Sequence, residues 1–213
     1  MHLHHWILAI TFLAVYAIAS SIDNSTNTRN DLIDGECAPL VYLFARGTDE
    51  KGNIGNNVGP AFLNSLDDVF PADYIIAQGV QPYPATVAGY KAGGSPEGSE
   101  AMAQLIERAD TQCPESEMIL SCWSQGCQVL HNAVNLTSPE IYPKFAALVL
   151  FGDPDLNTTF PTGVSDRIVK EYCHELDPIC HGIAKTNRAH DTYPEDADNA
   201  AQFVLDVYNQ TAV

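Results

Sequence analysis

The sequence has few basic residues, with 10 Lys and Arg against 27 Asp and Glu and a formal net charge of −17 at pH 7. Such an acidic surface repels nucleic acids and anionic membranes and argues against both as partners. Long apolar runs are also scarce, because after residue 19 none approaches the roughly 20 residues that a membrane helix needs. Internal repeats, low-complexity tracts and linkers are lacking as well. We therefore expect one acidic domain without stable membrane association.

The N-terminus carries the one long apolar stretch, which ends in Ala17-Ile18-Ala19 before polar sequence. This layout is typical of a secretory signal peptide with an A-x-A cleavage site, although its start has histidines and no Lys or Arg. A transmembrane anchor is the alternative, but the stretch is short for a span. We assign residues 1–19 to a signal peptide, the polar residues 20–36 to a flexible arm and residues 37–213 to a single α/β catalytic domain.

Cysteine and asparagine usage also indicates secretion. The six cysteines are an even number, and all lie after the signal segment. Four glycosylation sequons begin at Asn24, Asn135, Asn157 and Asn209. We expect an extracellular, disulfide-bonded glycoprotein that acts as a monomer.

Apolar runs alternate with amphipathic segments along the chain. The continuous apolar runs predict strands buried on both faces, at 39–45, 74–78, 118–122, 146–151 and 167–172. Helical patterns fall at 59–69, 95–110, 125–136 and 195–208. Strands alternating with helices predict a parallel sheet covered on both sides by helices.

The segment Cys122-Trp123-Ser124-Gln125-Gly126-Cys127 joins one of these strands to a helix. A serine on a sharp strand-to-helix turn is how an α/β hydrolase presents its nucleophile, within the pattern G-x-S-x-G. Backbone N–H groups at the start of the helix can stabilise a developing oxyanion. Gly126 supplies the second glycine of the pattern, whereas Cys122 replaces the first.

The histidine partner of Ser124 can be sought by elimination among seven histidines, three of which belong to the signal segment. His131 follows Ser124 by seven residues on the same helix, which places it about 10 Å away along the axis. In α/β hydrolases the acid and the histidine follow the nucleophile along the chain. His174, His181 and His190 remain, and His190 is best placed, in a polar loop before the last helix.

Three aspartates compete for the role of catalytic acid. Asp153 and Asp155 follow a predicted strand, whereas Asp177 lies between Cys173 and Cys180. A disulfide between these cysteines would close a tight loop and hold the Asp177 carboxylate where it could orient the histidine. We therefore choose Asp177.

The same segment invites a zinc interpretation, because Cys173-His174 and Cys180-His181 offer thiolate and imidazole ligands. Six residues separate the two cysteines, however, where structural zinc sites usually place two to four. A disulfide is favoured in a secreted chain, and we expect no metal site.

These residues resemble the cutinase family, small secreted serine esterases that include cutinases and related acetylxylan esterases. The matching motifs occur in the family's order over most of the chain from residue 37 onward. They are Ala45-Arg46-Gly47-Thr48 with Gly52-Asn53-Ile54-Gly55 and Gly59-Pro60, Gln78-Gly79-Val80 with Tyr83-Pro84-Ala85, Trp123-Ser124-Gln125-Gly126, Cys173 to Cys180, and His190 with Tyr193. The resemblance implies a small, lidless α/β-hydrolase fold with a parallel sheet of about five strands.

By position, the resemblance implies Ser124 as nucleophile, Asp177 as acid and His190 as base. It also implies an oxyanion hole made by the backbone N–H groups of Thr48 and Gln125, with the Thr48 hydroxyl as a further donor. The expected reaction is hydrolysis of a carboxylic ester, either a cutin-like polyester or a short-chain acyl ester, with an acetylated polysaccharide such as acetylxylan as the alternative. This chemistry needs no metal or organic cofactor.

The resemblance also implies the disulfides Cys37–Cys113 and Cys173–Cys180. A third, Cys122–Cys127, is our hypothesis for the nucleophile turn, and two buried thiols are the alternative.

Three further positions depart from the family pattern. Trp123 replaces a tyrosine, Asp49 stands where a neutral residue is commoner, and Leu176 replaces a glycine. A carboxylate near a developing oxyanion would oppose it. Asp49, Leu176 and Cys122 favour an alternative of another class, a secreted binding or elicitor protein that has lost catalysis.

Overall fold

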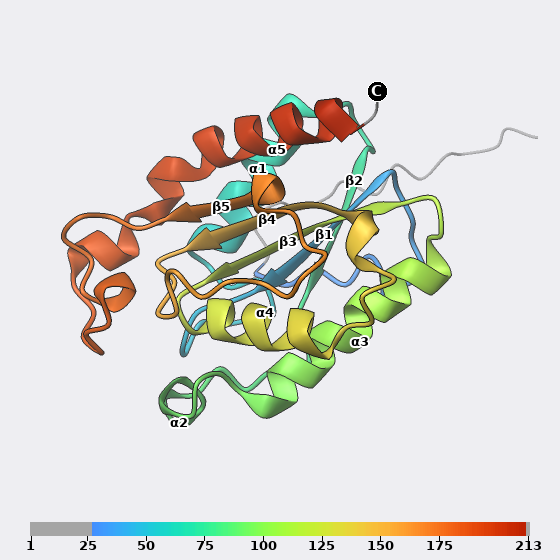
Figure 1. Cartoon of the computed structure of the whole chain (residues 1–213). Coiled ribbons are helices and arrows are strands. Elements are labelled where there is room, and N and C mark those ends of the chain that lie inside the picture. The colour runs from blue at the N-terminus through green and yellow to red at the C-terminus, as the bar shows by residue number, and fades with distance from the viewer. Residues whose placement is uncertain (1–26, 212–213) are drawn as a thin grey trace, which may run out of the picture.

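The computed structural model describes residues 27–211, so the expected signal peptide and the Asn24 sequon lie outside the described residues. Five parallel strands form one sheet in the order β2-β1-β3-β4-β5 (Figure 1). The strands are β1 (Leu40–Ala45), β2 (Ile75–Gly79), β3 (Glu117–Trp123), β4 (Phe145–Phe151) and β5 (Val169–Tyr172). All seven residues of β4 are buried, as expected of a parallel strand covered on both faces.

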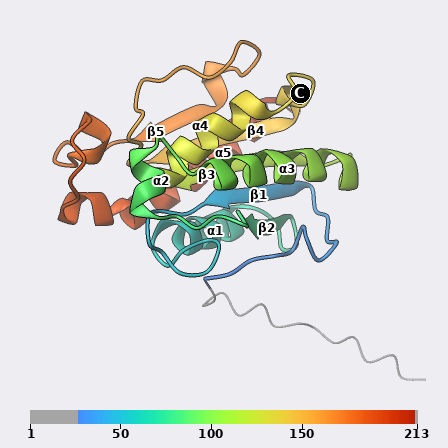
Figure 2. The same ribbon diagram turned by 90° about the horizontal axis from the view of Figure 1, so that it is seen from below.

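Helices cover both faces of the sheet, with α1 and α5 packed together on one side and α3 and α4 on the other (Figures 1 and 2). The helices are α1 (Val58–Val69), α2 (Val87–Lys91), α3 (Pro96–Gln112), α4 (Gln125–Leu136) and α5 (Ala197–Thr211). Two apolar clusters fill the spaces between sheet and helices, one for each face. This architecture confirms the expected α/β-hydrolase fold. The five-residue α2 was not predicted from the sequence.

Residues 27–36 differ from the expectation of a loose arm. Asn30 bridges Gln78 on the edge strand β2, and the backbone N–H of Asp31 donates to the carbonyl oxygen of Ala77 over 3.2 Å. The Asp31 carboxylate accepts the Ala77 N–H in return, over 2.9 Å. Leu32 is fully buried in the core. Ile33 packs partly against the same core. The polar composition of the segment hid these apolar contacts and the carboxylate that pairs with the backbone of β2.

Three disulfides join the six cysteines, in the pairs named from the sequence: Cys37–Cys113, Cys122–Cys127 and Cys173–Cys180. The first ties the segment before β1 to the end of α3, and the second links the end of β3 to the first turn of α4. The third closes the loop that follows β5. Within residues 27–211, no helix is both long and apolar enough to cross a membrane.

Candidate active site

Ser124 occupies the sharp turn between β3 and α4 at the carboxyl edge of the sheet. Its φ of 56° and ψ of −126° lie in a region that residues with a Cβ rarely adopt, and such strain is typical of a nucleophile elbow. Gly126 permits the turn, because a Cβ there would overlap the carbonyl oxygen of Ala45 on β1. The glycine of the pattern is therefore required for close approach of α4 to the sheet.

Cys122 stands where the elbow pattern usually has its first glycine. It lies on β3 between Ala45 on β1 and Leu150 on β4, and it is fully buried. Its side chain reaches the equally buried Cys127 in the first turn of α4 to form the disulfide. The departure from glycine is thus accommodated by a covalent link that spans Ser124.

His190 and Asp177 complete a chain of hydrogen bonds that begins at Ser124. His190 Nε2 lies 2.9 Å from Ser124 Oγ, and His190 Nδ1 lies 2.8 Å from Asp177 Oδ2. The three side chains come from the elbow, from the disulfide-closed loop after β5, and from a short 3-10 helix, η4 (Arg188–Asp191). All three residues are buried, with relative exposures of 6, 1 and 0% for Ser124, His190 and Asp177. The structure therefore brings together the three residues selected from the sequence.

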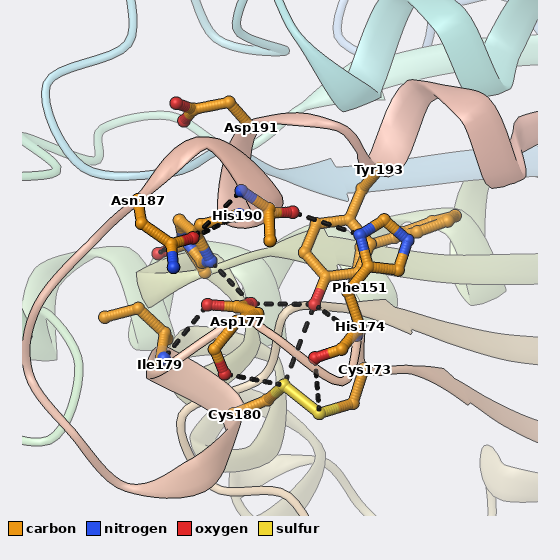
Figure 3. A network of polar contacts seen from close by, with 12 residues as sticks. Phe151, Cys173, His174, Asp177, Ile179, Cys180, Asn187, His190, Asp191 and Tyr193 are labelled. Carbon is orange, nitrogen blue, oxygen red and sulfur yellow. Dashed lines mark hydrogen bonds and ion pairs between the residues drawn. A yellow bond between two sulfur atoms is a disulfide. The ribbon is translucent and has the colours of Figure 1, made fainter.

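The Asp177 carboxylate accepts two further hydrogen bonds (Figure 3). The Tyr193 hydroxyl donates to Oδ2 over 2.7 Å, and the backbone N–H of Ile179 donates to Oδ1 over 2.9 Å. Burial raises the pKa of Asp177, but the hydrogen bonds from His190, Tyr193 and Ile179 outweigh it and leave the pKa below its ordinary value. Asp177 is thus held as a carboxylate facing Nδ1 of His190.

Trp123 and Asn187 position His190 from two sides. The indole stacks on the His190 ring with centroids 5.3 Å apart, and its Nε1 donates to the His190 carbonyl oxygen over 3.2 Å. Asn187 Oδ1 accepts the backbone N–H groups of Ala189 and His190, while its Nδ2 donates to the Leu176 carbonyl oxygen over 2.8 Å. Asn187 was missed in the sequence, where a polar residue in a polar loop gives no signal.

Thr48 and Gln125, the residues expected to form the oxyanion hole, are hydrogen-bonded to each other. The fully buried Gln125 donates from Nε2 to Thr48 Oγ1 and to the Thr86 carbonyl oxygen, each over 2.8 Å. Because Thr48 Oγ1 is an acceptor in this bond, its own proton remains available to another acceptor. The hydroxyl is partly exposed in the pocket beside Ser124.

Glu50 holds the loop that carries Thr48, a role that the sequence did not suggest. Its carboxylate accepts the backbone N–H groups of Gly47, Asn56 and Asn57 over 2.8–3.0 Å. Burial raises the pKa of Glu50, although these three hydrogen bonds oppose the rise. Gly and Asn residues around Glu50 indicate turns, but a glutamate among them gives no specific signal.

A pocket of about 550 Å³ opens over these residues. It is lined in part by Thr48, Val87, Trp123, Ser124 and His190. Asp49 lies at its exposed rim, with φ at 60° and its backbone N–H donating to the Ala85 carbonyl oxygen. Leu176 is 74% exposed and does not line the pocket.

The remaining sequence candidates lie elsewhere. His131 is buried against Asp153, with 2.8 Å between Nε2 and Oδ2, and makes no contact with Ser124. Cys173, Cys180 and His181 do cluster, but the two sulfurs are bonded to each other. A disulfide offers no thiolate to zinc, so the chemistry of this donor set does not fit a zinc ion.

A serine on a strained turn after the third strand of a helix-covered parallel sheet defines the protein as an α/β hydrolase. The family model "Cutinase" matches residues 36–208, which is most of the chain. The protein belongs to the cutinase family and is a carboxylic ester hydrolase.

Similar proteins include a cutinase from Blumeria hordei, 44% identical over 183 residues that cover 84% of this chain and 76% of that protein. A solved cutinase from Trichoderma reesei, in complex with a phosphonate inhibitor, superposes with a TM-score of 0.80 at 36% identity and covers 89% of this chain and 84% of its own. The catalytic core of an acetyl xylan esterase from Trichoderma reesei shares the fold, with a TM-score of 0.67 at 20% identity over 80% of this chain and 99% of its own.

Proposed function

We propose that this protein is a secreted serine esterase in which Ser124 is the nucleophile, His190 the general base and Asp177 the acid. The observation that carries the proposal is the chain of two hydrogen bonds, 2.9 Å from Ser124 Oγ to His190 Nε2 and 2.8 Å from His190 Nδ1 to Asp177 Oδ2. Asp177 holds the proton of His190 on Nδ1, which leaves Nε2 unprotonated and able to accept the Ser124 proton.

The reaction proceeds by acyl transfer to water. Ser124 Oγ attacks the ester carbonyl carbon while its proton passes to His190 Nε2. The tetrahedral intermediate collapses with cleavage of the bond to the alcohol oxygen, which takes the proton from His190. Water then attacks the acyl-enzyme with His190 again as base, and the carboxylic acid leaves as Ser124 is restored.

The backbone N–H groups of Thr48 and Gln125, with the Thr48 hydroxyl, form the proposed oxyanion hole. Gln125 is the first residue of α4, where backbone N–H groups lack partners within the helix. The bond from Gln125 Nε2 leaves the Thr48 proton free to point at the oxyanion. Each such donor is worth about 10²–10³ in kcat in comparable sites.

The test of the nucleophile is Ser124→Ala, assayed with p-nitrophenyl butyrate. We expect a folded protein that has lost at least about 10³-fold in kcat, because the residual rate would come from binding and the oxyanion hole alone. Circular dichroism checks the fold. Substantial turnover by the folded variant would refute the assignment.

For the substrate, we propose an aliphatic ester such as a cutin-like polyester. Apolar side chains of Val87, Trp123, Ile179 and Ala184 line the pocket, and the protein is more similar in sequence to the cutinases named above than to the acetyl xylan esterase. Comparing butyrate and palmitate esters with acetylated xylan tests this proposal. Preferential release of acetate from xylan would favour the acetylxylan esterase alternative.

An inactive binding protein is the alternative of another class, and Asp49 at the pocket rim is the feature that favours it. Ser124 nevertheless has a complete set of hydrogen-bonded partners. A fluorophosphonate probe distinguishes the two, because only an activated serine is labelled. An unlabelled, folded wild-type protein would establish the binding alternative.

We also propose secretion as a monomeric glycoprotein, with a single catalytic domain over residues 37–213. The asparagines of three sequons, Asn135, Asn157 and Asn209, are exposed, and the three disulfides fit an oxidising compartment. Expression in a eukaryotic secretory host should release protein that begins at Ser20 and loses mass on enzymatic deglycosylation. Light scattering should give the mass of one chain. Intracellular retention with an uncleaved N-terminus would contradict secretion.

A further inference from the structure

His174 lies directly behind the proposed catalytic residues, and the mechanism above does not use it. It follows Cys173 in the disulfide-closed loop, three residues before Asp177. Its imidazole is 27% exposed and stacks on the ring of Tyr193, with centroids 4.1 Å apart and planes 21° from parallel (Figure 3). The side chain is therefore fixed in place by an aromatic neighbour that itself donates to Asp177.

Both ring nitrogens of His174 face hydrogen-bond acceptors. Nε2 lies 2.6 Å from Asp196 Oδ2, just before α5, and Nδ1 lies 3.0 Å from the carbonyl oxygen of Ala189. A carboxylate and a carbonyl oxygen can only accept, so the ring is the donor in each bond it makes to them. The Thr192 hydroxyl lies 3.1 Å from both Nδ1 and the Ala189 carbonyl oxygen. The His174 side chain therefore bridges the turn that carries Ala189 to Asp196.

The contacts of His174 lead to both members of the histidine–aspartate pair. Its backbone N–H donates to the Tyr193 hydroxyl over 3.1 Å, and that hydroxyl donates to Asp177 Oδ2. Its side chain holds the carbonyl oxygen of Ala189, the residue directly before His190. His174 thus touches the supports of the acid and of the base without touching either reacting nitrogen or oxygen.

We propose that His174 is a positioning residue that fixes the Asp177–His190 pair for catalysis by bridging Ala189 to Asp196. The proposal rests on the proposed function of that pair. Both partners sit in loops and 3-10 turns rather than in the sheet, so their mutual geometry depends on such side-chain bridges. Small displacements of catalytic groups are costly, since an error of 1 Å can lower the rate about 10²-fold.

The first test is His174→Gln, because a glutamine amide can donate to one of the two acceptors and turns its oxygen toward the other. We expect kcat for p-nitrophenyl butyrate to fall about tenfold with KM changed less than about twofold. Fluorophosphonate labelling of Ser124 should slow by a similar factor. The matched control is His181→Gln in the same loop, since the exposed His181 side chain contacts the Glu175 carbonyl oxygen and Cys173 Sγ. The control should keep wild-type kinetics.

The second test changes the other end of the bridge, Asp196, which directly precedes α5. Asp196→Ala removes the acceptor for Nε2, whereas Asp196→Asn keeps an amide oxygen that can accept the same proton. We expect Asp196→Ala to lower kcat severalfold and Asp196→Asn to restore most of it. If His174→Gln does not fold, this pair of variants decides the question.

If the bridge only stabilised the fold, the variants would melt at a lower temperature but would have wild-type kinetics while folded. Folded His174→Gln or Asp196→Ala with wild-type kcat, labelling rate and pH profile of kcat/KM would overturn the proposal. Equal losses in Asp196→Ala and Asp196→Asn would also contradict the bridge. A wild-type protein that neither hydrolyses esters nor reacts with the probe would instead overturn the proposed function.

Discussion

Residues 27–211 contain two buried histidine–aspartate pairs with the same 2.8 Å spacing, His190 with Asp177 and His131 with Asp153. In the first pair the carboxylate contacts Nδ1, and Nε2 is left for Ser124. In the second the carboxylate contacts Nε2, and the ring stacks on Phe160 at a centroid distance of 4.5 Å. The two pairs have the same spacing and are both buried, but we propose different roles for them. In the first pair the second ring nitrogen of the histidine contacts the Ser124 hydroxyl, whereas the ring of His131 stacks on Phe160.

The surroundings of the two carboxylates differ as well. Asp177 accepts hydrogen bonds from Tyr193 and Ile179, whereas Asp153 stands near two other carboxylates, Asp155 and Glu171, whose pKa values rise through burial and through the charge of Asp153. In our proposal the first carboxylate orients His190 for proton transfer with Ser124. The second belongs to a cluster of carboxylates from β5 and the loop after β4, beside His131 of α4.

The largest difference between the pairs should appear on removal of each histidine. His190→Gln should lower kcat by about 10⁶-fold, because Ser124 loses its base. His131→Gln should keep kcat within about threefold but destabilise the fold by about 3 kcal/mol, since one partner of a buried pair is lost. Ester hydrolysis and thermal melting measure the two effects. A folded His131→Gln protein without activity would break the distinction.

Replacing the aspartate of each pair should show the same contrast in kcat, with a smaller loss in the first pair. Asp177→Asn should reduce kcat by about 10⁴-fold, because an amide favours the wrong tautomer of His190. The matched Asp153→Asn should leave kcat within about threefold. Steady-state kinetics on both folded variants measures this contrast. If Asp153→Asn lost as much activity as Asp177→Asn, the second pair would have a catalytic role.

The smallest expected effect concerns pH and the acidic cluster. Burial, reinforced by Asp153, raises the pKa of Glu171 from about 4.5 to about 7, and its Oε2 has no hydrogen-bond partner. A raised pKa in the folded state stabilises the protein below the unfolded value, and this contribution is lost as the pH rises through about 7.

Glu171→Gln should therefore gain stability relative to wild type between pH 5 and pH 8. We expect the difference in melting temperature to grow by about 2–4 °C, which corresponds to about 1 kcal/mol after allowance for partial exposure. Thermal melts across this range measure it, with the exposed Glu97→Gln on α3 as control. A difference that stays constant with pH would contradict the assignment.

Local patterns predicted the sheet and the strand-to-helix turn at Ser124 well. Strands buried on both faces read as continuous apolar runs, and the elbow is a contiguous motif, so both are written in short segments of sequence. Helical rise also separated His131 from Ser124 correctly. The short α2 and the burial of Leu32 were missed, because neither has enough apolar periodicity to rise above a polar background.

The residues that the loops contribute to the site were harder to predict from the sequence. His190 was chosen by chain order and its polar loop, and Asp177 by its place between Cys173 and Cys180, before the family resemblance pointed to the same two residues. Glu50 accepts backbone N–H groups of its own loop, whereas Asn187 and His174 bond backbone groups of other loop segments, and none of these bonds follows a spacing rule in the sequence. Such contacts emerge only when the loops are placed in space.

The packing of residues 27–36 has a practical consequence for producing this protein. The family match begins at residue 36, which makes that position an inviting start for a recombinant form. Such a truncation would remove Leu32 from the core and expose the edge of β2, where Asn30 and Asp31 now pair with the strand. An unpaired edge strand is a template for association between chains. A soluble recombinant form should therefore begin before residue 27.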